Sequence, residues 1–157
     1  MSERPNAGRR LFTVEEANAA LPLVQAIVKD VVAVSHDIVE RRERLALIKS
    51  GRRGKSNDPY AQELQGAEDE LEKERGRLYE FAEELRELGV ELKDGLIGLV
   101  DFPSMMEDRV VYLCWKLGEA EVLHWHELDS GFSGRRSLTA TATTTTDGDS
   151  ADSNADA

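Results

Sequence analysis

Two long segments carry apolar residues at alternating spacings of three and four, and this pattern constrains the fold more than any other feature. The first segment covers about residues 22–49 and the second about residues 60–88. Such spacing lines up apolar side chains along one face of an α-helix. The connecting residues 50–59, SGRRGKSNDP, favour turns. Two long helices with so short a connection predict an antiparallel helical hairpin over residues 14–88, ended by Gly89.

The apolar face of the first helix is wider than one partner helix covers. Each helix has a coiled-coil-like heptad seam with one polar position, Arg41 in the first and Glu74 in the second. A second stripe of Val28, Val32 and Val39 lies beside the first seam. We therefore expect this helix to contact more than one neighbour, and the width of its apolar face leads us to predict a homodimer.

The start of the first helix is marked by Thr13 and Glu16. A Thr followed three residues later by Glu forms a capping box, in which each side chain accepts the other residue's backbone N–H. Pro22 has no N–H and disrupts a helix interior. We therefore expect a short helix over about residues 14–20 and a long helix that opens near Pro22.

After Gly89 the period of the apolar residues changes to two. Short runs cover residues 90–93, 96–102, 109–117 and 122–129, with turn residues between them. This pattern predicts a meander of three or four antiparallel strands. The fold class is therefore α+β, a long helical hairpin packed on a small antiparallel β-meander. The residues expected to face the helices are Val111, Leu113, Trp115, Leu123 and Trp125.

Length and composition predict one domain over residues 11–138. Residues 1–10 are expected to be flexible, and residues 139–157, rich in Thr and Asp and without Lys or Arg, are expected to be disordered. The net charge of −11 argues against general DNA binding. The single cysteine excludes disulfides and suits a reducing compartment. Without an apolar signal segment or a long enough apolar stretch, we expect a cytoplasmic protein that does not enter membranes.

Two histidines in one predicted strand form the strongest candidate for chemistry. His124 and His126 are two residues apart, so both imidazoles project from the same face of a strand. A transition metal ion such as zinc suits this pair, and Cys114 or Asp101 could supply a third ligand. The alternative is that the two histidines line a half-polar sheet face or a dimer contact.

Basic residues mark two further candidates. Arg52, Arg53 and Lys55 lie at the tip of the predicted hairpin, where they could bind phosphate, RNA or an acidic partner. The alternative is a solvated turn that keeps the tip soluble. Near the end of the predicted domain, Arg135 and the backbone of residues 130–134 could bind an anion or simply close the domain.

Several short motifs are spread over residues 11–138. They are FTVEEAN from Phe12 with Leu21-Pro22, GLVDFP from Gly98, VYLCW from Val111 with Leu117-Gly118-Glu119, and HELD from His126 with Gly131-Phe132 and Gly134-Arg135. Together these motifs resemble the bacterial and archaeal family catalogued as domain of unknown function 2203. The resemblance implies a small cytoplasmic protein and carries over no activity and no catalytic residue.

Two functions therefore remain open. The first is a non-enzymatic interaction or oligomerisation module that uses the helical hairpin, with a protein partner or a second copy on its apolar face. The second is a metal-binding protein, or a metal-dependent enzyme, centred on His124 and His126. The hairpin tip adds a possible local contact with an anionic partner.

Overall fold

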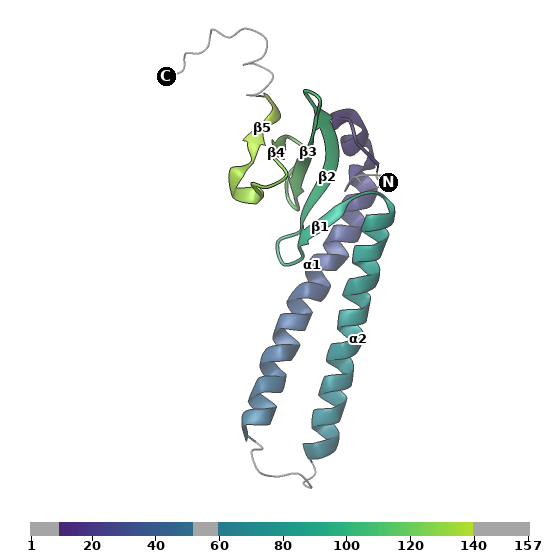
Figure 1. Ribbon diagram of the computed structural model, residues 1–157. Helices are drawn as coiled ribbons and strands as arrows, with labels where there is room; N and C mark the ends of the chain where they lie inside the picture. The colour runs from purple at the N-terminus through teal and green to yellow at the C-terminus, as the bar shows by residue number, and fades with distance from the viewer. Residues whose placement is uncertain (1–9, 52–59, 140–157) are drawn as a thin grey trace, which may run out of the picture.

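A computed structural model describes residues 10–51 and 60–139 of the chain. Two long helices are followed by a small antiparallel sheet, which confirms the predicted α+β class (Figure 1). The basic residues Arg52, Arg53 and Lys55 lie outside the described residues. So do residues 1–9 and 140–157, on which the predictions for the two ends of the chain rest.

The first helix, α1 (Val14–Gly51), continues through Pro22, so the predicted break at this residue is wrong. Pro22 itself is exposed, while Leu21 and Val24 beside it are buried. Proline in a helix interior costs about 3 kcal/mol. The apolar side chains buried on both sides of Pro22 stabilise the helix by more than this cost, because they pack in the main core.

The capping box at the start of α1 is present as predicted. The Glu16 N–H donates to Thr13 Oγ1 and the Thr13 N–H donates to Glu16 Oε1, each at 3.0 Å. Just before it, the Phe12 N–H donates to the Pro103 carbonyl at 2.7 Å, and the Phe12 ring meets Phe102 edge to face at 5.1 Å. These contacts attach the beginning of α1 to the sheet.

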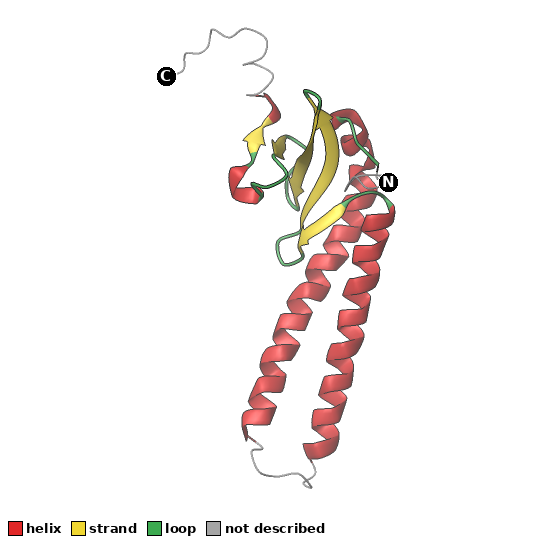
Figure 2. Cartoon of the chain, in the orientation of Figure 1, coloured by secondary structure: helices red, strands yellow, loops and turns green. Residues whose placement is uncertain are grey.

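The second helix, α2 (Tyr60–Glu87), runs back beside α1 (Figure 2). Its end has the predicted glycine: the Val90 N–H donates to the Leu85 carbonyl and the Gly89 N–H to the Arg86 carbonyl, both at 2.9 Å. These two bonds form a Schellman motif, which Gly89 permits with its φ of 92°. The chain therefore turns directly from α2 into the sheet.

The sheet contains five antiparallel strands in chain order, whereas the sequence predicted three or four. They are β1 (Glu91–Asp94), β2 (Leu99–Met106), β3 (Arg109–Lys116), β4 (His124–His126) and β5 (Arg136–Ser137). Because β4 pairs with β3 only over its three residues, Leu123 lies outside the paired segment. Leu123 is 43% exposed whereas Trp125 is buried, so the prediction that Leu123 faces the helices is wrong.

One face of the sheet packs on the helices and forms the main core. The core contains α1 residues such as Val24, Val28 and Val31, and sheet residues such as Phe102 and Trp115. The wide apolar stripe of α1 is thus largely covered by the sheet of the same chain. The second neighbour that the stripe requires is present without another copy, so the homodimer stays a prediction.

By length and composition alone, α1 would be able to cross a membrane. Core helices of soluble proteins have the same property, and nine residues of α1 are buried in the structure. The absence of membrane association therefore stays a prediction.

A glycine turn before β2 lies close to α1. Gly98 has a φ of 72°, and a Cβ added to it would lie 2.8 Å from both Val28 Cγ1 and Leu117 Cβ and 3.1 Å from Val32 Cγ2. Gly118 has a φ of 107°, but a Cβ added there would meet nothing within 4 Å. An alanine at Gly118 would therefore add backbone strain alone, whereas an alanine at Gly98 would add both backbone strain and steric crowding.

We expect Gly118→Ala to lower the free energy of unfolding by about 1–2 kcal/mol through backbone strain alone. Gly98→Ala should lower it by about a further 1–3 kcal/mol, because its methyl group also presses on α1 and on Leu117. Urea denaturation of the two variants measures this difference. Equal losses would contradict the tight contact between α1 and the turn.

Candidate metal centre

The outer face of the sheet, opposite the helices, carries a cluster of Asp101, Cys114 and His126. The three residues come from the neighbouring strands β2, β3 and β4. Each alternates with core residues of its own strand, such as Phe102 and Trp115, so its side chain leaves the opposite face. Asp101 and Cys114 are also direct cross-strand partners. The register of the strands thus brings the three together.

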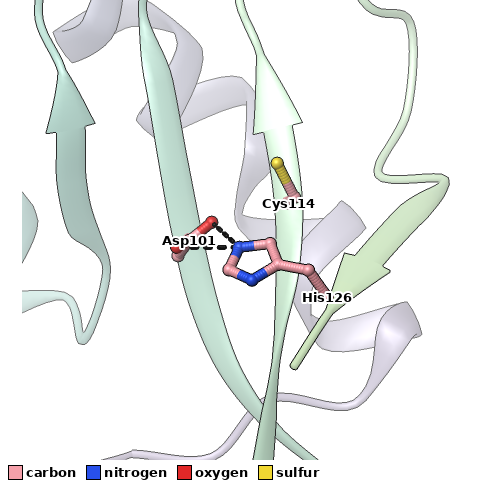
Figure 3. Close-up of side chains that lie close together, drawn as sticks. All are labelled: Asp101, Cys114 and His126. Atoms are coloured by element: carbon pink, nitrogen blue, oxygen red, sulfur yellow. Dashed lines mark hydrogen bonds and ion pairs between the residues drawn. The ribbon is translucent and has the colours of Figure 1, made fainter. Parts of the chain in front are cut away.

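The donor atoms of this cluster all lie within 4.8 Å of one another, and the three residues are buried (Figure 3). His126 Nε2 is 3.1 Å from both carboxylate oxygens of Asp101. His126 Nδ1 lies 2.7 Å from the Glu127 carbonyl oxygen. Because a carbonyl only accepts, Nδ1 must carry a proton, and Nε2 is the nitrogen that faces the cluster.

Burial controls the protonation of the cluster. Burial raises the pKa of Asp101, while the nearby His126 and Lys93 oppose the rise. Burial also raises the pKa of the Cys114 thiol to about 11. Cys114 is therefore a protonated thiol near neutral pH, and its S–H donates to Asp101. The carboxylate of Asp101 accepts from both the thiol and the imidazole.

This order of groups does not suit a cysteine nucleophile. A nucleophilic cysteine needs a histidine beside its sulfur to accept the proton, with the carboxylate behind the histidine. Here the carboxylate of Asp101, and not the imidazole of His126, accepts from the Cys114 thiol, and the thiol pKa is raised rather than lowered. A thiol, a carboxylate and an imidazole nitrogen that converge on one point are instead the donor types that bind zinc.

The segment around η1 (Phe132–Gly134) contributes Arg135, which lies over the sulfur of Cys114. Arg135 Nη1 is 3.6 Å from Cys114 Sγ, and the guanidinium forms an ion pair with Glu119 and stacks on the Phe132 ring at 4.6 Å. Burial opposes the charge of Glu119, but hydrogen bonds from Arg135 and the Lys116 N–H bring its pKa below the ordinary value. Anion binding at Arg135 stays a prediction, although this guanidinium already has a carboxylate partner.

The structure separates the two histidines of the predicted pair. His126 joins Asp101 and Cys114, whereas His124 is outside the group whose donor atoms lie within 4.8 Å. His124 is half-buried and directly opposite Cys114 in the register of β3 and β4. Its Nδ1 atom is buried and has no hydrogen-bond partner among the described residues.

Two contacts of the site could not be read from the sequence. Asp101 and Cys114 are recognisable as possible ligands by residue type, but the role of the Glu127 carbonyl has no sequence signal because every residue carries one. The pairing of Glu119 with Arg135 likewise joins residues that are 16 positions apart in loops. Only the path of the chain over the sheet brings them together.

A family model described as an uncharacterized conserved protein family, DUF2203, matches residues 10–138. The chain belongs to this family. The match includes the helical hairpin, the sheet and every residue of the cluster, and it confirms the resemblance found in the sequence motifs. Comparison with curated proteins and with solved structures finds no significant match.

Native Cys114 is expected to react with iodoacetamide at pH 8 at least about 100-fold more slowly than in urea. The thiol pKa of about 11 is well above the ordinary 9.0, and each pKa unit lowers the thiolate fraction about tenfold. Cys114 is the sole cysteine, so all labelling reports on it.

The same shift predicts how stability depends on pH. Because the folded-state pKa of Cys114 is higher than the unfolded-state pKa, the protonated thiol favours the folded state below pH 9, and this contribution is lost as the pH rises towards 11.

For the alkylation experiment, equal rates in the native and unfolded protein would contradict the burial of this thiol.

Proposed function

We propose that this protein binds a transition metal ion, with zinc as the best candidate, through Asp101, Cys114 and His126. The observation that carries the proposal is the convergence of three different donor atoms, all within 4.8 Å of one another, in a buried place. This proposal keeps His126 from the predicted histidine pair and joins it with both Asp101 and Cys114, which the sequence offered as third ligands.

The hydrogen bonds around His126 support this proposal. Histidine ligands usually donate their second N–H to a carbonyl or carboxylate, which orients the ring and selects the nitrogen that binds the ion. His126 has this arrangement, since Nδ1 donates to the Glu127 carbonyl at 2.7 Å and Nε2 faces the cluster. The imidazole is thus oriented before an ion arrives.

Charge balance also supports it. A divalent ion held by the Asp101 carboxylate and a Cys114 thiolate gives a net charge of zero, because the two negative ligands balance the two positive charges of the ion. The buried site therefore needs no additional charge, which would be costly in a place so isolated from water.

The donor types select the class of ion. Magnesium and calcium prefer oxygen ligands, whereas a thiolate and an imidazole favour zinc and related transition metals. The donor residues are at most 3% exposed, so a substrate would reach the ion only if the covering segment moved. We therefore propose binding of the ion rather than catalysis as the role of this site.

The full-length protein without a histidine tag is expected to bind about one zinc ion per chain and to become more stable to heat. His126→Gln and Cys114→Ser should each weaken binding by more than about 100-fold, because even second-shell changes at metal sites cost 10–100-fold. Elemental analysis and competition with a chromogenic chelator measure stoichiometry and affinity.

The matched control is His36→Ala. His36 lies on α1 away from the cluster, where its Nε2 is 3.0 Å from the Leu96 carbonyl oxygen. This variant should bind zinc like the wild type. Zinc affinity should also fall by about 10-fold or more per pH unit below neutrality, because the ion must displace the proton of the Cys114 thiol, whose pKa is raised to about 11. Wild-type protein without stoichiometric zinc would overturn the proposal.

We keep the interaction module as a second candidate, because several large apolar side chains on the helical hairpin are exposed. Leu47 is 74% exposed, Tyr79 66% and Tyr60 56%. A homodimer that uses such side chains should appear as twice the chain mass of 17.5 kDa in light scattering at tens of micromolar protein. Leu47→Glu with Tyr79→Glu should shift it to monomer. A wild-type monomer would contradict this candidate.

The hairpin tip gives a third, local proposal that rests on sequence alone. Arg52, Arg53 and Lys55 are proposed to contact an anionic partner such as RNA or an acidic protein surface. Binding to a polyanion such as heparin should weaken as salt rises and should disappear when the three residues are changed to Gln. Binding that does not depend on salt would contradict the proposal.

A further inference from the structure

We infer that His124 supplies a fourth ligand to the proposed metal site, which makes it a closed, four-coordinate zinc site. This inference rests on the proposed function and extends it. A site with three protein ligands leaves a position for water and substrate, as in catalytic zinc enzymes, whereas a site with four ligands is structural or regulatory. The role of His124 therefore decides the class of the site.

The position of His124 places it beside the cluster. It is the direct cross-strand partner of Cys114, which is in turn the partner of Asp101. The three residues thus form one row across β2, β3 and β4 on the outer face of the sheet. Directly opposed residues of antiparallel strands have Cβ atoms about 4.5–5.5 Å apart, so the imidazole of His124 starts within side-chain reach of the sulfur.

The chemistry of His124 matches this position. Its Nδ1 atom is buried and has no hydrogen-bond partner among the described residues. Buried nitrogen atoms in native proteins nearly always have a partner, and an unsatisfied one costs free energy. A metal ion at the cluster would satisfy this atom.

The other polar side chains beside His124 are already engaged. Glu119 accepts hydrogen bonds from Arg135 and from the Lys116 N–H. On the other side of the cluster, the Tyr112 hydroxyl donates to Glu91 Oε2 at 3.1 Å. His124 is therefore the neighbouring side chain whose buried donor atom is available, and a rotation of its ring would bring it to the ion.

Cobalt(II) in place of zinc tests this inference, because its visible spectrum reports the coordination number. The full-length protein loaded with cobalt should show the intense visible bands of a tetrahedral ion and a near-ultraviolet band from the Cys114 thiolate. In His124→Ala the visible bands should weaken, since water would replace the imidazole, while the thiolate band should remain. Zinc affinity should fall by about 10-fold or more.

Two controls keep the possible outcomes distinct. His36→Ala is the matched histidine substitution and should leave the cobalt spectrum unchanged, and far-ultraviolet circular dichroism of the metal-free variants checks that they fold. If the wild type binds neither zinc nor cobalt, the proposed function itself fails. If the wild type binds and His124→Ala has the same spectrum and affinity, only the fourth ligand is overturned and the site is open.

Discussion

The packing of α1 against one face of the sheet is the contact on which the rest of the structure depends. Val24, Val28 and Val31 are fully buried together with Phe102 and Trp115. Successive side chains of a strand point to opposite faces of the sheet. When the core residues face the helices, the residues between them therefore face the other side. The polar cluster is therefore a consequence of the core. A shift of one residue in the register would bring its members into the core.

The cluster lies on the outer face of the sheet, so another part of the chain must cover it. The segment around Arg135 covers it. The ion pair of Arg135 with Glu119, and the stacking of Arg135 on Phe132, hold this segment over Cys114. Buried polar groups are stable only when they are satisfied. Within the cluster, Asp101 meets this condition by accepting from Cys114 and His126. A divalent ion would also satisfy these groups.

Local signals in the sequence predicted the helical part of the fold closely. The capping box of Thr13 and Glu16 and the stop at Gly89 depend on residues a few positions apart, and both are present. The continuous helix through Pro22 was not predicted, because the cost of proline is local whereas the compensating burial of Leu21 and Val24 comes from the distant sheet.

The sequence by itself determined the α+β class, the order of the elements, the family and the residue types capable of binding a metal. It did not determine which of these residues meet. His124 and His126 look equivalent in the sequence, yet only His126 reaches Asp101. This choice depends on the register of three strands and on the segment that covers them, both of which arise from contacts between distant parts of the chain. Spacing along one strand contains no information about those contacts.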